Sequence, residues 1–392
     1  MNVPELALSA AQAADVEARF DAILRFAASR TIADIALKPS QRPLYRRFGQ
    51  LIFKRDDPTF GVDELAAIVA QWMPSHAREE YDRCGHATFM VTLVACGRFR
   101  ITALQSRGAP SLAVRVVSSR VLNLRELNLP RLLTTWAMVP HGLVLVSAGP
   151  GGGKSATWAG LLEHVNTASP QTRQVITLES PIEQTFADKV AFVHQRELGS
   201  DTLDVPSGVA SALRQAPDVF GVDGATGADL PSLAALAELP ILVVASLSAG
   251  GVVDAVRQFV LAVPESDRGQ MRLRLARRLR GVVHLALVPT VDGKGLVPAC
   301  ELLHVTPQIA EILRSDKDLE SLQAIIEAPA QRAFGMCGLD QALLELAQAT
   351  TVAPEAAVAL ARDSDGIKGR LAAIRRPTKH ISGQTALTDP KF

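Results

Sequence analysis

The chain has 392 residues, which at roughly 150 residues per domain predicts two or three domains, each long enough to bury its own core. Hydrophobic residues make up 48% of the chain and charged residues 21%, so it is too apolar to be mainly disordered. The 41 Lys and Arg residues against 40 Asp and Glu residues give a formal net charge of +1. This balance excludes a chain-wide positive field for nucleic acid or anionic lipid, so contact of either kind would be local.

Export and membrane insertion are not expected. The first ten residues, MNVPELALSA, contain Glu5 and have no basic segment ahead of an apolar stretch, unlike a signal peptide. The apolar uncharged run 239–253 is shorter than the ~18 to 20 apolar residues that a membrane span needs. The cysteines form no C-x-x-C pair, which fits a reducing compartment: Cys84, Cys96, Cys300 and Cys337. We therefore expect a cytoplasmic protein.

The first part of the chain predicts a domain of mixed helices and strands. Apolar residues at helical spacing predict an amphipathic helix over 8–29 and a second helix over 62–73. Short β-prone segments separated by Pro, Gly and charged turns lie at 31–37, 44–53, 87–94, 99–104 and 112–117. Together these elements predict an α+β domain over residues 1–121.

A connector at 122–136, predicted to be helical, leads into a second domain at 137–303. This domain is predicted to be α/β, because short Val-, Ile- and Leu-rich runs alternate with helical segments, as in parallel sheets buried on both faces. The expected strands are 143–147, 174–178, 219–222 and 241–245. Beyond it, 304–374 is expected to be helical, and 375–392 lacks apolar periodicity and is expected to be a mobile tail.

A glycine-rich loop between an expected strand and an expected helix is the strongest single motif. Its residues are Gly149, Pro150, Gly151, Gly152, Gly153, Lys154, Ser155 and Ala156. In the phosphate loop G-x-x-x-x-G-K-[ST], backbone N–H groups face the phosphates, the lysine reaches the β and γ oxygens, and the hydroxyl ligates Mg²⁺. Lys154 and Ser155 would take these roles with ATP and Mg²⁺. Ala148 replaces the first Gly, and the alternative is a glycine-rich turn that only resembles the motif.

Six segments in order extend the match well beyond this loop: GRFRITALQSRGAPSLAVRVVSS (97–119), HGLVLVSAGPGGGKS (141–155), VITLESPIE (175–183), VHQRELGSDT (193–202), LRQAPDV (213–219) and GMCGLDQALLEL (335–346). Over residues 31–371 the chain thereby resembles the PilT family, the retraction motors of type IV pili within the type II/type IV secretion ATPase superfamily. The resemblance implies a PAS-like N-terminal domain, a RecA-like ATPase domain, and a six-membered ring with ATP between the two domains.

The first departure from the family lies in its aspartate box, which reads roughly I-E-D-P-I-E. This chain has LESPIE at 178–183, so one acid is lost and two are kept. Glu179 is the remaining candidate for activating water or organising Mg²⁺, because a carboxylate near the γ-phosphate can orient the attacking water. The alternative is an exposed acid at the end of a strand.

The second departure lies in the Walker B segment, where the family has Gly-Glu-Met-Arg-Asp after the strand. This chain has VDGATG at 222–227, and Gly224 stands at the glutamate position. Asp223 lies one residue early, which in a strand points a side chain to the opposite face unless a bulge at Gly224 corrects it. Asp223 is therefore a conditional catalytic candidate.

The third departure is the loss of the family's His box, T-L-H-T, which is SLSA at 246–249 here. Ser248 can donate a hydrogen bond to a phosphate oxygen but cannot supply the positive charge that stabilises the developing γ-phosphoryl group. The A-I-R segment that the family uses in retraction is Gln-Ile-Ala at 308–310, without the arginine.

Four arginines stand at family positions in the N-terminal domain: Arg98, Arg100, Arg107 and Arg115. Arg98 and Arg100 share a strand face. The resemblance implies that such arginines reach the γ-phosphate held by a neighbouring subunit, an arginine-finger role worth ~10³ to 10⁵ in rate. The alternative for each is a solvated arginine on a strand.

A further arginine cluster lies in 268–280, expected to be helical: Arg268, Arg272, Arg274, Arg277, Arg278 and Arg280. The neutral overall charge and the lack of interleaved aromatic residues argue against a nucleic-acid interface. A subunit interface or a rim facing a partner is the favoured interpretation.

These observations lead to one functional hypothesis and one alternative. Losing a water-positioning acid costs ~10² to 10⁴ in rate, and losing a γ-phosphate stabiliser costs about as much again. We therefore expect an ATP- and Mg²⁺-binding ring subunit of the twitching motility machinery, with weak or absent hydrolysis and an accessory role. Its implied partners are further copies or a PilT-like paralogue, and a platform protein at the inner membrane. The alternative is a fully active retraction motor.

Overall fold

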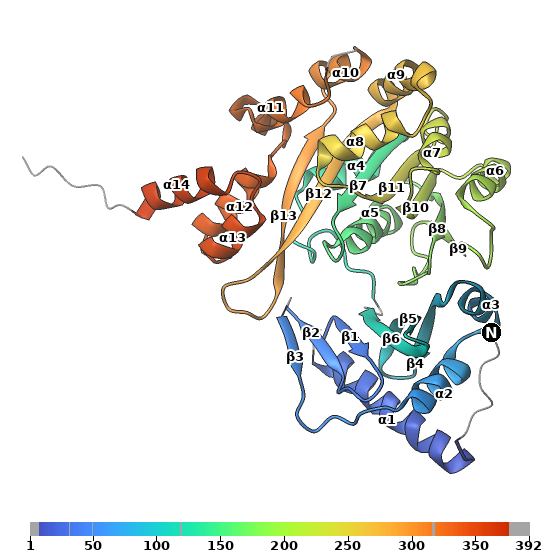
Figure 1. Ribbon diagram of the computed structural model, residues 1–392. Coiled ribbons are helices and arrows are strands. Elements are labelled where there is room, and N and C mark those ends of the chain that lie inside the picture. The colour runs from blue at the N-terminus through green and yellow to red at the C-terminus, as the bar shows by residue number, and fades with distance from the viewer. Residues whose placement is uncertain (1–7, 31, 49, 118–119, 316–317, 376–392) are drawn as a thin grey trace, which may run out of the picture.

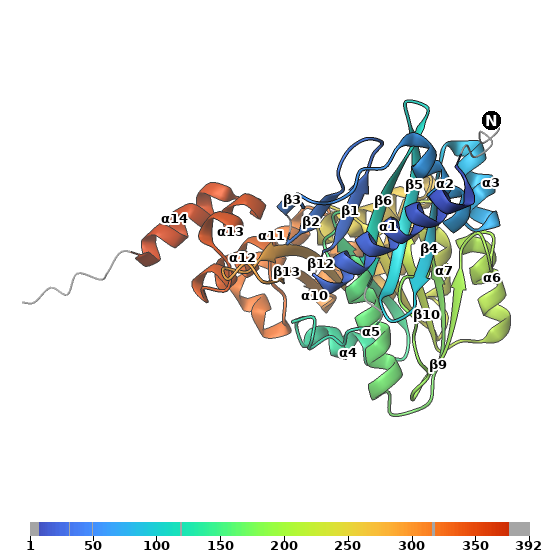
Figure 2. The same cartoon turned by 90° about the horizontal axis from the view of Figure 1, so that it is seen from below.

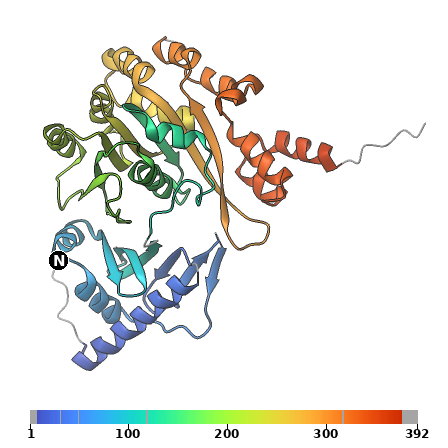
Figure 3. The ribbon, with the colours of Figure 1, turned by 180° about the vertical axis from the view of Figure 1, so that it is seen from behind.

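The computed structural model describes residues 8–30, 32–48, 50–117, 120–315 and 318–375 (Figure 1). An N-terminal domain and a larger sheet domain lie one above the other, and the last helices project to one side of the larger domain. The view from behind shows the same three parts (Figure 3). Among the described residues, none of the helices combines the length and apolar character needed to cross a bilayer.

The N-terminal domain is an antiparallel sheet of six strands in the order β3-β2-β1-β6-β5-β4. Its strands are β1 (Asp34–Leu37), β2 (Leu44–Arg47), β3 (Gln50–Phe53), β4 (His86–Leu93), β5 (Gly97–Ser106) and β6 (Ala109–Val117). Its helices are α1 (Ala10–Ser29), α2 (Val62–Trp72) and α3 (Ser75–Cys84). Figure 2 shows α1 lying across this sheet.

The two faces of this sheet have different chemistry because side chains alternate along a strand. On β5, Phe99 and Ile101 are buried in one core with Phe20 and Leu24 of α1. The other face carries the arginines of β5 and β6 and is directed at the second domain. The N-terminal domain therefore uses its apolar face for stability and its basic face for contact.

The second domain is a seven-stranded sheet in the order β13-β12-β7-β11-β10-β8-β9. Its strands are β7 (Gly142–Ala148), β8 (Gln174–Glu179), β9 (Phe192–Glu197), β10 (Val219–Ala225), β11 (Leu242–Ser248), β12 (Leu279–Pro289) and β13 (Leu296–His304). Every neighbouring pair is parallel except β12 and β13, which form an antiparallel hairpin.

Helices cover both faces of this sheet, as a mostly parallel sheet requires. One face packs against α4 (Leu132–Met138) and α5 (Lys154–Ala168). The other packs against α6 (Val205–Gln215), α7 (Leu230–Leu236), α8 (Val252–Leu261) and α9 (Arg268–Arg278). Trp136, Trp158, Phe220 and Phe259 are among the largest side chains buried in these two layers.

The chain then continues as α10 (Pro307–Arg314), α11 (Ser321–Glu327), α12 (Leu339–Gln348), α13 (Pro354–Leu360) and α14 (Ser364–Arg375). The first two extend the helical layer of the sheet domain. The last three form a small separate core with the β12–β13 hairpin, built around Val288, Ala299, Leu343 and Ile367.

The predicted α/β fold class is confirmed, with differences in particular elements. The segment 44–53 is a hairpin and not one strand, and α3, β9, β12 and β13 were not predicted from the pattern. The connector is helical only from Leu132 onward. Arg280 was expected on the arginine-rich helix but lies in β12, because the helix ends at Arg278. The expected tail, apart from Arg375 in α14, lies outside the described residues.

Two phenylalanines of the N-terminal domain test this arrangement. Phe99 is fully buried between the sheet and α1, whereas Phe53 on the edge strand β3 is 67% exposed. We expect Phe99→Ala to lower the free energy of unfolding by about 3 to 5 kcal/mol. The matched variant Phe53→Ala should lower the free energy of unfolding by less than about 1 kcal/mol. Urea unfolding of both variants would measure this, and equal losses would contradict the assignment of the two faces.

Candidate functional site

The glycine-rich loop connects the end of β7 to the start of α5. It spans 149–153, and Lys154 is the first residue of the helix. Gly153 has a φ of +88°, which lets the chain turn directly into α5. A Cβ on Gly152 would lie 2.7 Å from the Cβ of Ala148, so the loop is tight. The loop thus presents backbone N–H groups at a helix N-terminus, where anions are favoured.

Lys154 is held by the neighbouring strand β11. Its Nζ donates a hydrogen bond of 2.7 Å to Oγ of Ser248. The contact follows from the sheet, because Ser248 at the end of β11 pairs with Ala148 at the end of β7. Ser248 therefore touches the lysine of the glycine-rich loop with an uncharged hydroxyl group.

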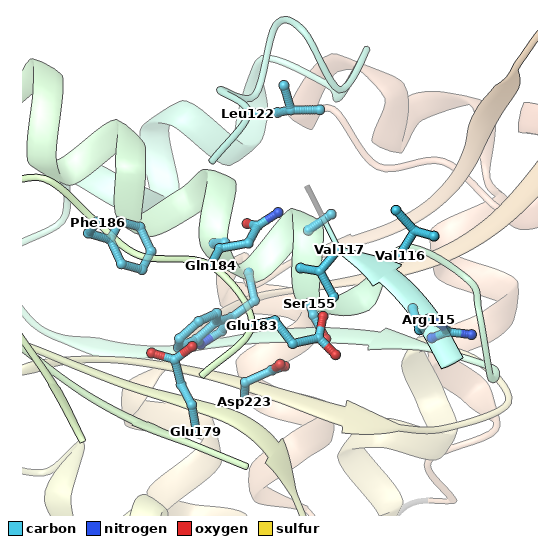
Figure 4. A pocket seen from close by; sticks show the side chains of 13 residues that line it. Arg115, Val116, Val117, Leu122, Ser155, Glu179, Glu183, Gln184, Phe186 and Asp223 are labelled. Carbon is cyan, nitrogen blue, oxygen red and sulfur yellow. The ribbon is translucent and has the colours of Figure 1, made fainter. Parts of the chain in front are cut away.

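A pocket lies beside this loop, between the two domains (Figure 4). Ser155, Trp158 and Ala159 of α5 contribute one wall. The remaining walls come from both domains and include Arg115, Val116, Val117, Leu122, Glu179, Glu183, Gln184, Phe186 and Asp223. The pocket therefore combines an apolar part with three carboxylates and an arginine.

Glu179 is a buried acid at the end of β8, with only 3% of its surface exposed. The alternative of an exposed strand-end acid is therefore wrong. Its Oε1 accepts hydrogen bonds from Thr177 Oγ1 at 2.7 Å and from Gln195 Nε2 at 2.8 Å. Burial raises the pKa of Glu179 to about 7, and the charges of Asp223 and Glu183 also raise it.

Asp223 reaches the same pocket because β10 contains a bulge at Gly224. Val222 pairs with Ala245 but Ala225 pairs with Leu247, so β10 has one extra residue. Gly224 has a φ of +78°, and its N–H donates to Ser246 Oγ at 2.8 Å. The sequence required a bulge at Gly224 for Asp223 to face the site, and the backbone has this bulge.

Ser246 holds Asp223 in this position. It is fully buried, and its hydroxyl donates a hydrogen bond to Asp223 Oδ1 while accepting the one from Gly224. The sequence pattern alone predicted no role for Ser246. A polar residue within the apolar run of β11 was the available signal.

A loop after β8, residues 180–186, links the pocket to the basic face of the N-terminal sheet. Arg98 Nη2 donates to the carbonyl of Ile182 at 2.7 Å, and Arg100 pairs with Glu183. Burial raises the pKa of Glu183, and the positive charge of Arg100 offsets part of this increase. Arg98 and Arg100 are thus domain-bridging residues and not solvated strand arginines.

The other two candidate arginines lie in different surroundings. Arg115 lines the pocket, and its Nε donates to Asp34 Oδ1 at 2.8 Å. Arg107 lies in the turn between β5 and β6, with a φ of +55°, and is exposed. The structure therefore brings Arg98, Arg100 and Arg115 to the domain boundary of one chain and leaves Arg107 at the opposite end of its strand.

Gln195 on β9 is a second residue that pattern analysis missed. Besides Glu179, its Nε2 donates to the carbonyl of Gln184 at 2.8 Å, and its Oε1 accepts from the N–H of Phe186 at 2.9 Å. One amide group therefore fixes both the buried acid and the loop beside it. β9 was not predicted as a strand, so its alternation could not reveal this side chain.

Three members of the arginine cluster contact other parts of the chain. Arg272 donates to the carbonyls of Ile312 and Leu313 at the end of α10. Arg274 lies 3.5 Å from Glu238, and Arg280 donates to the carbonyl of His141 at 3.1 Å. Part of this cluster therefore stabilises the sheet domain itself.

The loop, the strand order and the adjacent acids define a phosphate-loop protein built on a mostly parallel sheet. The sequence pattern of the family described as type II/IV secretion system protein matches residues 87–227. The twitching motility protein of Neisseria gonorrhoeae is 31% identical over 311 residues, which cover 79% of this chain and 82% of that protein. This chain therefore belongs to the type II/IV secretion system protein family, and its motif-based resemblance to PilT is confirmed at that level.

Two further comparisons agree over most of the chain. The type IV pilus ATPase PilU of Pseudomonas aeruginosa is 27% identical over 350 residues, covering 89% of this chain and 90% of that protein. The solved structure of the pilus retraction motor PilT with bound ADP has a TM-score of 0.73 and 27% identity. The match covers 87% of this chain and 96% of the PilT chain, so both domains are shared.

The raised pKa of Glu179 makes stability depend on pH. Because the folded state holds its proton up to about pH 7, it binds more protons than the unfolded chain, whose glutamates ionise near pH 4.3. Raising the pH through this window therefore destabilises the wild type. Between about pH 5.5 and about pH 8, we expect the free energy of unfolding of the wild type to fall by about 2 kcal/mol relative to that of Glu179→Gln. Urea unfolding of both proteins would measure this difference. Parallel pH profiles for both proteins would contradict this.

Proposed function

We propose that this protein is an ATP-binding ring subunit of the type IV pilus machinery for twitching motility, with weak or absent hydrolysis and an accessory or regulatory role. The observation that carries the proposal is the contact between Lys154 and Ser248. It combines an intact phosphate-binding lysine with a serine at the position where the PilT family has a histidine.

Binding of ATP would use the loop and the pocket together. The N-terminus of α5 and Lys154 would hold the phosphates, and Ser155 is the residue to ligate Mg²⁺. These groups fit that use, because Ser155 lines the pocket directly after the lysine. The apolar wall formed by Val117, Trp158 and Phe186 would take the base.

Hydrolysis would depend on groups that are only partly suited to it. Burial raises the pKa of Glu179 to about 7, and in its protonated form the side chain is no base. Ser248 supplies no positive charge beside the γ-phosphate. A water-activating glutamate at Gly224 would require a side chain at a φ of +78°, which L-residues rarely adopt.

The fully active motor remains the second candidate because of a specific observation. The bulge in β10 turns Asp223 into the pocket that Glu179 also lines, so two carboxylates are available near the phosphates. Asp223, or Glu179 in its ionised form, would then be placed to orient water when Mg²⁺ and ATP are bound.

Partners and location are proposed from the relatives. PilT is described as a pilus retraction motor and PilU as a type IV pilus ATPase. By that likeness, this chain would form a six-membered ring with itself or a PilT-like paralogue, in the cytoplasm at the inner membrane, against a platform protein. Arg98, Arg100, Arg107 and Arg115 are the candidates to act on nucleotide in the ring, and nucleic acid is not a proposed partner.

Lys154→Ala tests nucleotide binding. The lysine supplies the positive charge nearest to the β and γ oxygens, so its loss should abolish measurable binding of ATP with Mg²⁺ in titration calorimetry. Lys368→Ala is the matched control, because Lys368 lies on α14 and pairs with Asp365 on the same helix. Equal binding by wild type and Lys154→Ala would mean that the loop is not a nucleotide site.

Ser248→His tests the cause of weak turnover. Wild type should hydrolyse ATP at well under ~1 s⁻¹, the low end for phosphoryl-transfer enzymes. An imidazolium beside Lys154 would restore positive charge near the γ-phosphate, and turnover in the assembled ring should rise at least about tenfold. Ser248→Ala is the control and should not raise it. A wild-type rate of several per second would refute the proposal and support the active motor.

A further inference from the structure

The segment that follows Ser248 is fixed at nearly every residue. It runs from the end of β11 to the start of α8 as Ser248-Ala249-Gly250-Gly251-Val252. Gln258 Nε2 donates to the carbonyl of Ser248 at 2.9 Å, and the N–H of Gly250 donates to Asp254 Oδ2 at 2.8 Å. These contacts come from α8, so they hold the segment from one side.

The other side is held by an ion pair between distant parts of the chain. Glu301 on β13 has a side chain that is fully buried, and Arg362 between α13 and α14 contacts both of its oxygens. The same carboxylate accepts the N–H of Val252 at 2.9 Å, and Arg362 Nη2 also donates to the carbonyl of Gly250 at 3.3 Å. The guanidinium therefore touches the segment directly and through Glu301.

Arg362 is itself fixed by the C-terminal helices. Its backbone N–H and that of Asp363 each donate to a carboxylate oxygen of Asp340 on α12, both at 2.8 Å. Arg362 is thus tied to α12 through the backbone N–H groups on both sides of its Cα and to the Ser248 segment through its side chain. This gives a continuous chain of polar contacts from α12 to Lys154.

Gly251 leaves the space that this contact needs. A Cβ at that position would lie 2.0 Å from Nη2 of Arg362 and 3.1 Å from Oε2 of Glu301. Its φ of +171° is ordinary extended backbone, so the requirement is space and not conformation. The absence of a side chain at Gly251 therefore makes room for the guanidinium of Arg362.

We propose that Arg362 is a positioning residue that couples the C-terminal helices α12–α14 to the nucleotide site by holding the segment from Ser248 to Val252. The coupling to nucleotide rests on the proposed ATP binding, whereas the placement of the segment does not. Because Ser248 contacts the lysine that reaches the γ-phosphate, the effect should be larger for ATP than for ADP.

Arg362→Lys is the sharpest variant. It keeps a positive charge beside the buried Glu301, but an ammonium lacks the planar fork that serves Glu301 and Gly250 together. Gly251→Ala disturbs the same contact from the other side without changing charge. Arg370→Lys is the matched control, because Arg370 on α14 donates to Gln341 on α12 and lies outside this chain of contacts.

Two measurements judge the proposal. In hydrogen exchange of the nucleotide-free proteins, amides at 249–253 should exchange several-fold faster in Arg362→Lys and Gly251→Ala than in wild type and Arg370→Lys. In calorimetry with Mg²⁺, both test variants should bind ATP about fivefold more weakly, while binding of ADP changes by less than about twofold.

The outcomes separate the two ideas. Unchanged exchange at 249–253 in both test variants would overturn the positioning role, whatever the nucleotide data are. Faster exchange with equal losses for ATP and ADP would overturn the selective coupling. A wild type that binds neither nucleotide would overturn the proposed function and the coupling with it, leaving exchange to judge the placement of the segment.

Discussion

The candidate site depends on one constraint, the parallel register of β7 and β11. Ala148 and Ser248 end these strands as direct partners, so the phosphate loop and the His-box segment emerge side by side. Because parallel strands bring their carboxyl ends to one edge, β8 and β10 deliver Glu179 and Asp223 to the same place. The hydrogen bond from Lys154 to Ser248 follows from this register and not from any local signal.

The sequence predicted those parts whose signals are local. The glycine-rich loop, the apolar strand before it and the helix after it have such local signals, and they form as expected. The β12–β13 hairpin was missed because Arg280 interrupts the start of its first strand and Pro298 and Glu301 interrupt the second. The charge of the buried Glu301 is balanced by Arg362, far along the chain.

The polar residues around the acids were harder to predict, because their role is to satisfy groups that burial would otherwise leave unpaired. Gln195 and Ser246 serve Glu179 and Asp223 from neighbouring strands, so their partners are separated in sequence. The sequence showed that Asp223 would need a bulge at Gly224 to face the pocket, but not that the bulge forms. Register and bulges are decided by the whole sheet.

Electric charge limits what the acids of the pocket can do. Glu179, Glu183 and Asp223 line one pocket, and burial, together with the charge of Asp223, raises the pKa values of Glu179 and Glu183. Bound phosphates would add negative charge, which Mg²⁺, Lys154 and arginines would have to balance before Glu179 could ionise and act as a base. Arg100 is paired with Glu183 and Arg115 with Asp34, so part of the positive charge of each arginine is already balanced by a carboxylate. Under the proposed function, these charges and the uncharged Ser248 favour holding ATP over cleaving it.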